Sequence, residues 1–385
     1  MLNRVGPISI LHVIALSMTM IGLKNHVTIL PPILSHGGRD GWMSVIFSAI
    51  LLFPWLFLLI YIHHQSKQKN IREWLLETVG PRFGKVFVYF ISGFLILLSA
   101  FSLREALQWM RTTFLPTTSV LVLLIIFTVL CILLASSNIQ TIAILNILVL
   151  FGVLVLGFFI AFVNIPVKDH YLLLPLLENG IEPVVKASIY PAAGYVEIIL
   201  LLFIQQHFKE KMKWYHLGIL LFLLMGLTMG PLIGAISEFG PKEAAKQMYP
   251  AYEEWGLARI GQFIEHIDFF SIYQWLTGAF IRVGLILFIV VELLDIKQQK
   301  KKIWLVIAPI FMVLSIGLIW ISDQLFLKLK GNYFLIITFV FFFVLAFVFA
   351  WIAYRNKKKR KKEDKQEKIG RRRRAKSNRK EQETI

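Results

Sequence analysis

Long apolar stretches separated by short polar loops make up most of this chain. About twenty consecutive apolar residues suffice to cross a bilayer as a helix, and a window of about nineteen residues detects such stretches. Ten segments have this character: 8–34, 42–63, 84–107, 118–136, 141–163, 184–207, 215–237, 263–294, 303–322 and 333–354. The pattern predicts an all-α integral membrane protein. It has ten transmembrane helices in a domain over residues 1–354, followed by a basic cytoplasmic tail over residues 355–385 that we expect to be disordered.

Two of the apolar segments contain residues that interrupt a membrane helix. The first carries Gly22-Leu23-Lys24-Asn25-His26, and the sixth carries Tyr190-Pro191-Ala192-Ala193-Gly194-Tyr195-Val196-Glu197. Irregular backbone and charge at bilayer depth are tolerated only inside protein or along a cavity. Pro191 lacks an amide hydrogen and Gly194 is conformationally permissive. Both segments are therefore predicted to be broken helices beside a cavity.

The two interruptions stand at corresponding places if the ten helices form two halves of five. Transporters built as inverted repeats place broken helices 1 and 6 in this way. No residue-level repeat relates the two halves of the sequence. The five-plus-five inverted-repeat fold is thus predicted from the helix number and the paired breaks alone.

Broken helices expose backbone groups that can bind a small zwitterion. Freed amides at a helix N-terminus favour a carboxylate, and freed carbonyls favour an ammonium or a cation, so an amino acid suits both. The candidate ligand-binding residues are Gly22, Leu23, Asn25, Ala193, Gly194 and Tyr195 at the breaks, with Tyr273 and Thr277 one turn apart in the eighth segment. The alternative for Gly22 and Gly194 is close helix packing by small residues.

Charged groups inside the apolar segments are candidates for an ion pair or a gate. These are Lys24, His26 and Glu197. An unpaired carboxylate in the sixth segment would be costly, so Glu197 is expected to pair with Lys24. Arg104, near the end of the third segment, either meets a carboxylate or extends to the membrane interface.

The distribution of positive charge predicts the orientation in the membrane. The chain has 41 Lys and Arg against 23 Asp and Glu, and the loops after segments 2, 6 and 8 are dense in Lys and Arg. Both termini are therefore expected in the cytoplasm. The tail after Tyr354 is the most basic part, and it would attract anionic membrane lipids. The alternative is a solvated anchor that only fixes topology. Nucleic-acid binding is not expected, because no aromatic residues interleave these charges.

Two connections carry short helical patterns. Residues 67–80 place Ile71, Trp74, Leu75 and Val79 at helical spacing, which predicts an amphipathic cytoplasmic helix. The external connection from Ser237 to Gln262 is expected to contain a short helix at 242–248.

Enzymatic and metal chemistry has no support in the sequence. The single cysteine, Cys131, lies in an apolar run and allows no disulfide within the chain. No phosphate-binding loop, zinc-protease motif or nucleophile elbow is present, and no acidic cluster has metal spacing. We expect no cofactor and no enzyme activity.

Several stretches resemble one known family. They are Gly22–Val27 with Pro31-Pro32 and Gly38–Trp42; Leu174-Pro175 with Glu178–Gly180 and Pro183; Gly194 with Glu197; and Tyr249–Glu254 with Ile260–Phe269. Together they resemble the B subunit of endospore germinant receptors, the spore germination permease family within the amino acid/polyamine/organocation superfamily. The similarity covers nearly all of residues 5–355, and the basic tail lies outside it.

The resemblance implies a transporter-like fold in the spore inner membrane. It also implies a nutrient, such as an amino acid, sensed between helices 1, 3, 6 and 8, and assembly with an A subunit and a C subunit to trigger germination. The best-known members have a glycine–small–glycine break in helix 1, whereas this chain has Gly22-Leu23-Lys24-Asn25-His26. The alternative function is a secondary amino-acid transporter coupled to a proton or sodium ion.

Overall fold

The computed structural model describes residues 7–260 and 266–382, and within these ranges the regular structure is helical. A β-bridge joins Ile8 to Phe208. The α-helices are α1 (Ile10–Leu23), α2 (Leu30–Gly37), α3 (Gly41–Gln65), α4 (Ile71–Val79), α5 (Pro81–Thr113), α6 (Val120–Ala135), α7 (Ile139–Val163), α8 (Glu182–Ala187), α9 (Ile189–Tyr195), α10 (Trp214–Phe239), α11 (Pro241–Ala244), α12 (Pro250–Gly256), α13 (Phe270–Leu294), α14 (Lys300–Lys302), α15 (Ala308–Ile319), α16 (Asp323–Leu329) and α17 (Leu335–Gln382).

The apolar segments predicted from the sequence coincide with helical runs. Nine runs in the described part of the chain are long and apolar enough to cross a membrane, and α6, with 16 residues, is shorter. The start of the eighth predicted segment lies outside the described residues, and its helical run begins at Ile267. An all-helical membrane fold is therefore confirmed. The number of ten crossings and the inverted repeat stay predictions.

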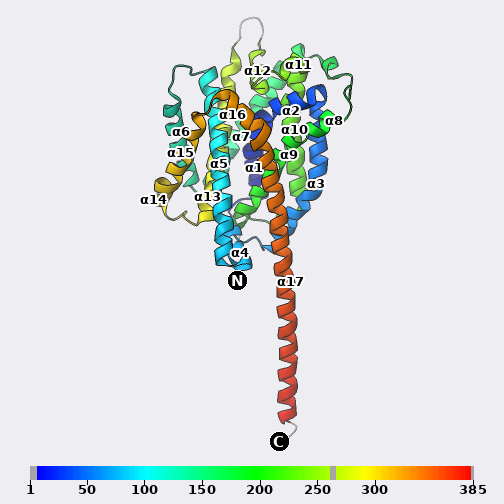
Figure 1. The fold of residues 1–385 in the computed structure, drawn as a ribbon, viewed down its shortest axis with the longest axis vertical. Coiled ribbons are helices and arrows are strands. Elements are labelled where there is room, and N and C mark those ends of the chain that lie inside the picture. The colour runs from blue at the N-terminus through cyan, green and yellow to red at the C-terminus, as the bar shows by residue number, and fades with distance from the viewer. Residues whose placement is uncertain (1–6, 261–265, 383–385) are drawn as a thin grey trace.

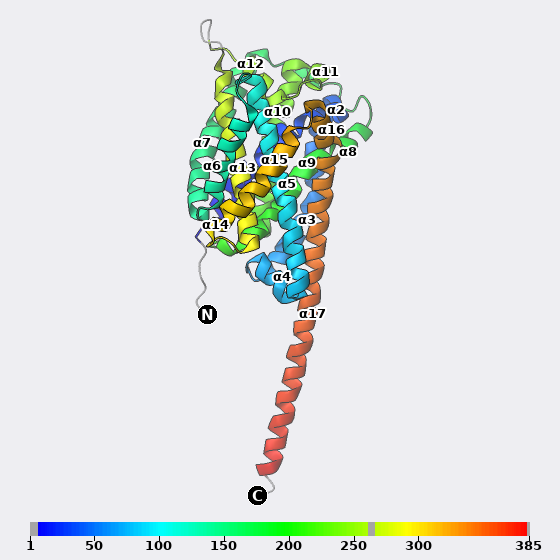
Figure 2. The ribbon, with the colours of Figure 1, turned by 60° about the vertical axis from the view of Figure 1, so that its left-hand side comes forward.

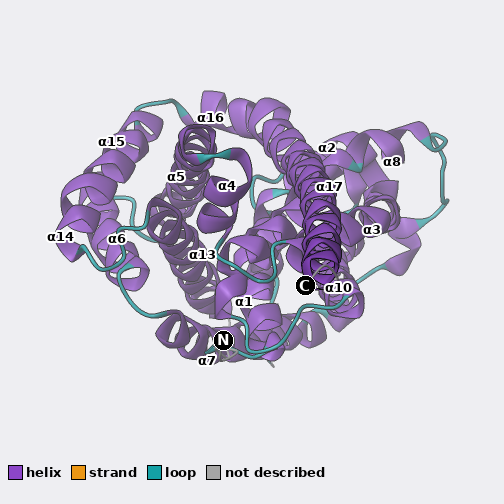
Figure 3. Ribbon diagram, turned by 90° about the horizontal axis from the view of Figure 1, so that it is seen from below, coloured by secondary structure: helices purple, strands orange, loops and turns teal. Residues whose placement is uncertain are grey.

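The three most enclosed spans are those that carry the predicted site. Within an apolar 18-residue window of each span, 89% of the residues are buried in Glu182–His207, 78% in Ile267–Leu294 and 67% in Ile10–Thr28, against 28% in Ile139–Val163. Seen along the bundle axis, α1 and α13 lie in the interior while α14, α15 and α3 lie toward the outside (Figure 3). The sixth and eighth spans and the first thus form the centre of the molecule.

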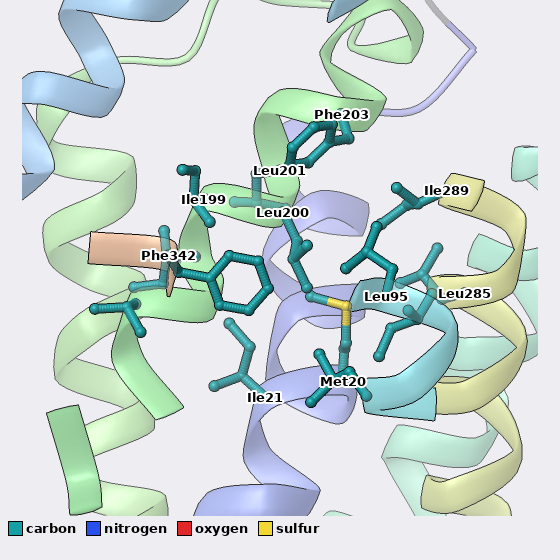
Figure 4. Packing of buried hydrophobic residues seen from close by; sticks show 14 of the residues in the cluster. Met20, Ile21, Leu95, Ile199, Leu200, Leu201, Phe203, Leu285, Ile289 and Phe342 are labelled. Carbon is teal, nitrogen blue, oxygen red and sulfur yellow. The ribbon is translucent and has the colours of Figure 1, made fainter. Parts of the chain in front are cut away.

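Apolar side chains from several of the long spans close this centre. Figure 4 shows Met20 and Ile21 from α1 beside Leu95 from α5 and Phe342 from α17. All four are nearly or completely inaccessible to solvent. Lipid tails are as apolar as these side chains, so close van der Waals packing between the helices is what stabilises this centre. The polar groups described below therefore lie between tightly packed apolar layers.

Both predicted breaks are irregular helices rather than unwound chain. A π-helical turn at Lys24–Thr28 joins α1 to α2. The sixth span continues from α9 into a 3₁₀ helix, η5 (Val196–His207), which is buried over most of its length. Such changes of hydrogen-bond register are common at functional sites, and a 3₁₀ run of this length is unusual. The backbone stays helical at both places, but its carbonyls are redirected.

The two connections that were predicted to contain short helices do contain them, but the surroundings of the first and the extent of the second differ from the prediction. The predicted helix at 67–80 is α4, and its Trp74 is 1% exposed and meets the Phe349 ring of α17 edge-on. Its apolar face thus packs on the protein and not on lipid. In the external connection, α11 begins near the predicted helix and ends at Ala244, while α12 was not predicted.

The basic tail is helical in the structure, where the sequence led us to expect disorder. Figures 1 and 2 show α17 leaving the bundle at the end where α4 lies and continuing straight to the C-terminus. Lys, Arg, Glu and Gln are good helix formers, and opposite charges four residues apart support a helix. The opposite end of the bundle carries α2, α11 and α12 (Figure 1).

Candidate functional site

A fully buried carboxylate joins the three central spans. Glu197, at the start of η5, accepts from Lys24 Nζ at 2.8 Å and from Arg282 Nη1 and Nη2 at 2.7 and 3.0 Å. The three side chains are at most 4% exposed. The pairing of Lys24 with Glu197 was expected from the sequence, whereas Arg282 was missed as the second partner. Its only sequence signal was an arginine in the middle of an apolar span.

The same two cations also hold backbone carbonyls near the irregular turns. Lys24 Nζ donates to the Ala193 carbonyl at 2.8 Å, and Arg282 donates to the Met20 carbonyl and, through Nε, to Ser102 Oγ at 3.0 Å. Charge-assisted bonds of this kind are stronger than neutral ones. Helices 1, 3, 6 and 8 are therefore tied together by one polar cluster.

A second buried ion pair lies beside the first cluster. Lys330, in the π-helical turn between α16 and α17, donates to Glu105 of α5 at 2.5 Å. The other Glu105 oxygen accepts from the Thr28 hydroxyl at 2.8 Å. Lys330 and Glu105 are 4% and 5% exposed. Neither residue was predicted to belong to the site, because Glu105 lies at the end of the third apolar segment and Lys330 lies in the connection before the last one.

A small cavity of about 20 Å³ separates the two ion clusters. This is space for about one water molecule. Its lining also includes apolar residues, among them Phe101 and Phe334, whose ring centroids lie 3.7 Å apart in a stacked arrangement. The lining residues are Lys24, Thr28, Leu98, Phe101, Ser102, Glu105, Arg282, Lys330, Phe334 and Leu335. The cavity thus combines charged and apolar lining residues and is far smaller than an amino acid.

Asn25 and Gly194 make the closest approach between the two irregular helices. A Cβ atom added to Gly194 would overlap the Asn25 side chain, so glycine is required there for packing. The Asn25 amide is fully buried and, among the described residues, has no hydrogen-bond partner. An unpaired buried amide costs about 1–3 kcal/mol, so it is a natural contact for a ligand. Gly22 packs in the same way against Leu227.

The remaining predicted residues lie around or away from this centre. Leu23 packs on Gly278, Tyr195 is 1% exposed, and His26 Nδ1 is 3.1 Å from the Leu227 carbonyl. Tyr273 and Thr277 face elsewhere: the Tyr273 hydroxyl donates to Val149 of α7 at 3.3 Å, and Thr277 donates to the Tyr273 carbonyl. The structure therefore does not bring these two residues to the cavity.

Arg104 pairs with a carboxylate, which was the first of the two alternatives given for it, and not the extension to the membrane interface. Its Nη2 is 2.5 Å from Asp323 of α16, and its guanidinium lies 4.3 Å from the centre of the Phe326 ring. Arg104 also donates to the Leu318 and Ile321 carbonyls at 3.3 Å. This contact fastens α16 to α5 next to the cavity.

Apolar spans that enclose a charged centre at two irregular helices define a permease-like, multi-pass integral membrane protein. Within this class the sequence comparisons specify the family. A family model described as "Spore germination protein" matches residues 8–326. The chain belongs to this family of spore germination proteins.

Three relatives illustrate the range of similarity. The chain is 37% identical to "Spore germination protein XB" of Bacillus anthracis over 340 residues, covering 88% of this chain and 95% of that protein. It is 28% identical to "Putative spore germination protein YfkT" of Bacillus subtilis, covering 74% and 78%. It is 22% identical to "Spore germination protein KB" of Bacillus subtilis, covering 66% and 69%. The similarity thus extends along almost the whole bundle.

Proposed function

We propose that this protein is the nutrient-sensing B-type membrane subunit of a spore germinant receptor. One observation carries the proposal: in a chain of this family, the irregular turns of helices 1 and 6 meet at a buried polar cluster with a cavity beside it. The ligand is a small nutrient such as an amino acid. Its contacts are Asn25, Gly194 and the charged groups around Glu197.

The proposed setting is the spore inner membrane, with both termini in the cytoplasm. The apolar spans and the basic loops support this orientation. The partners would be an A subunit and a C subunit of the receptor, and the basic tail would meet anionic lipids beside the last span.

Sensing would use the cluster as a tie between helices. A ligand shifts a conformational equilibrium only by its different affinities for the two states. A cavity of about 20 Å³ does not hold an amino acid, so binding requires the helices around Glu197 and Glu105 to separate. The energy of ligand contacts would in this way be converted into a helix movement that partner subunits detect.

The test is a germination screen on spores that lack this protein, using a panel of single amino acids and sugars. We expect loss of the response to at least one nutrient. A strain carrying Gly194→Val should show the same loss, because the added side chain occupies the space of Asn25. Gly230→Val is the matched control, since nothing lies within 4 Å of a Cβ atom at Gly230. Normal germination of the deletion strain with every nutrient would refute the receptor.

Secondary transport is the second candidate function, because irregular paired helices and buried ionisable groups are also features of ion-coupled carriers. Purified protein in vesicles distinguishes the two. Accumulation of labelled amino acid driven by a proton or sodium gradient would favour transport. Binding without accumulation would favour the receptor.

A further inference from the structure

The charged groups at the cavity are not balanced. Lys24, Arg282 and Lys330 are positive, Glu197 and Glu105 are negative, and each is at most 5% exposed. Three cations against two carboxylates leave one excess positive charge. A buried charge without a partner is strongly unfavourable in an apolar surrounding. All three cations line the cavity, whereas Glu105 is the only carboxylate that does.

Hydrogen-bond donors at the cavity are likewise in excess. An ammonium group has three N–H donors. Within the described part of the chain, Lys330 Nζ donates to Glu105 alone, and Lys24 Nζ donates to Glu197 and Ala193. Two N–H groups of Lys330 and one of Lys24 are left for a ligand. A carboxylate, with its two oxygens in one plane, would accept hydrogen bonds from them. The lining also includes Phe101 and Phe334, whose stacked rings suit a short apolar group.

We propose that the ligand of this site is a small monocarboxylate that binds as an anion, with its carboxylate oxygens on Lys330 and Lys24. The ligand balances the excess charge and takes the place of Glu105 as the partner of Lys330. Glu105 keeps its hydrogen bond from Thr28. This inference rests on the proposed function and narrows it, because the carboxylate becomes the obligatory group and a net negative charge is preferred over a zwitterion.

Release of Lys330 from Glu105 also explains how binding would reach other helices. Lys330 lies in the π-helical turn that joins α16 to α17, and Glu105 belongs to α5. When the ligand carboxylate replaces Glu105, Lys330 still has one carboxylate partner. The Lys330–Glu105 ion pair, which links α5 to the turn before α17, is lost, and Lys330 pairs with a diffusible molecule instead.

The experiment measures ligand-dependent shifts of the unfolding temperature of the purified full chain in detergent. The probes are L-lactate, L-lactamide and L-alanine, which have nearly the same size. Lactate has a net negative charge, lactamide is uncharged, and alanine is a zwitterion. We expect at least tenfold tighter binding of lactate than of alanine, and no saturable effect of lactamide. Equal affinities for lactate and lactamide would overturn the proposal. The proposal would also be overturned if chloride raised the unfolding temperature and abolished the further shift caused by lactate, because the site would then bind anions without selecting a carboxylate.

Charge variants test the role of Lys330 directly. Lys330→Gln removes the excess charge, so lactate affinity should fall at least thirtyfold. The double variant Lys330→Gln with Glu105→Gln restores one excess positive charge and should regain part of the affinity. Lys328→Gln, on the exposed side of α16, is the matched control and should bind as the wild type does.

Recovery in the double variant separates a charge effect from misfolding, and equal loss in the single and double variants would contradict the proposal. The receptor is tested independently. A deletion strain that fails to germinate, together with a Lys330→Gln protein that binds lactate normally, would refute this inference and leave the proposed function standing.

Discussion

At the scale of single residues, Glu197 holds the centre of the molecule. Its carboxylate accepts three hydrogen bonds from two cations on different helices and is inaccessible to solvent. Removing one partner of a buried ion pair typically costs 3–5 kcal/mol, because the other charge is left behind. Since Glu197 serves two cations, it fixes the relative positions of the first, sixth and eighth spans.

Glu254 is a buried acid outside the membrane spans, and it predicts a pH dependence of stability. Burial, and next the Glu238 carboxylate, raise the pKa of Glu254 well above its usual 4.5. The folded state therefore holds this proton at a higher pH than the unfolded state does. Its contribution to stability is complete below pH 4.5 and is lost as the pH rises through the raised value.

Glu254→Gln cannot ionise, so it should unfold a few degrees higher than the wild type at pH 8 and at nearly the same temperature at pH 4.5. Thermal unfolding in detergent across this range is the measurement. Glu243→Gln is the control, because Glu243 is exposed and pairs only with Lys246 on the surface. A Glu254→Gln protein less stable than the wild type at pH 8 would show the assignment to be wrong.

The sequence located part of the site and could not locate the rest, for physical reasons. Lys24, Asn25, Gly194 and Glu197 are recognisable because polar residues and glycine are costly in apolar helices. Lys330 and Glu105 required distances between helices, which hydropathy does not contain. Tyr273 and Thr277 belong to the eighth span, but they precede Arg282 and donate to the Val149 carbonyl and to the Tyr273 carbonyl. A span that is apolar on nearly every side gives little information about its rotation.

At the scale of elements, α4 shows how a short amphipathic helix becomes part of the core. Trp74 packs against Phe349 with 1% of its surface exposed. Trp74→Ala should destabilise the protein by about 3–5 kcal/mol, as large cavities do. Trp320→Ala, at a position 82% exposed, should change stability by less than about 0.5 kcal/mol. Chemical unfolding in detergent measures both, and a small effect at Trp74 would mean that α4 lies on lipid instead.

The helices themselves were predictable because hydropathy is a property of whole segments. The irregular turns were predicted in position but not in kind. Pro191, Gly194 and the polar run after Gly22 indicate a disturbed helix, whereas the choice of a π turn in one place and a 3₁₀ run in the other depends on packing between helices. Disorder of the tail was inferred from charge density, and strong helix formers allow the alternative seen in the structure.

At the scale of the whole molecule, the orientation in the membrane is a direct test of the charge pattern. Cys131 is fully buried, so cysteines introduced elsewhere can be labelled against a silent background. Lys301→Cys should react with a membrane-impermeant maleimide only from the cytoplasmic side, and Lys242→Cys only from the opposite side. Both residues are exposed, and they lie in successive connections at opposite ends of the bundle. Reversed labelling would invert the topology.

The helical run from Asp323 through Lys330 to Gln382 is continuous and has the shape of a long rod. At 1.5 Å per residue, the part beyond Lys330 is roughly 80 Å long. If exchange of the Lys330 partner tilted this rod by about 5° about its Lys330 end, the opposite, basic tip would move by about 7 Å by the same geometry. A small displacement at the cavity would thus become a larger one at the basic end, where a neighbouring subunit could contact the helix and respond to the movement.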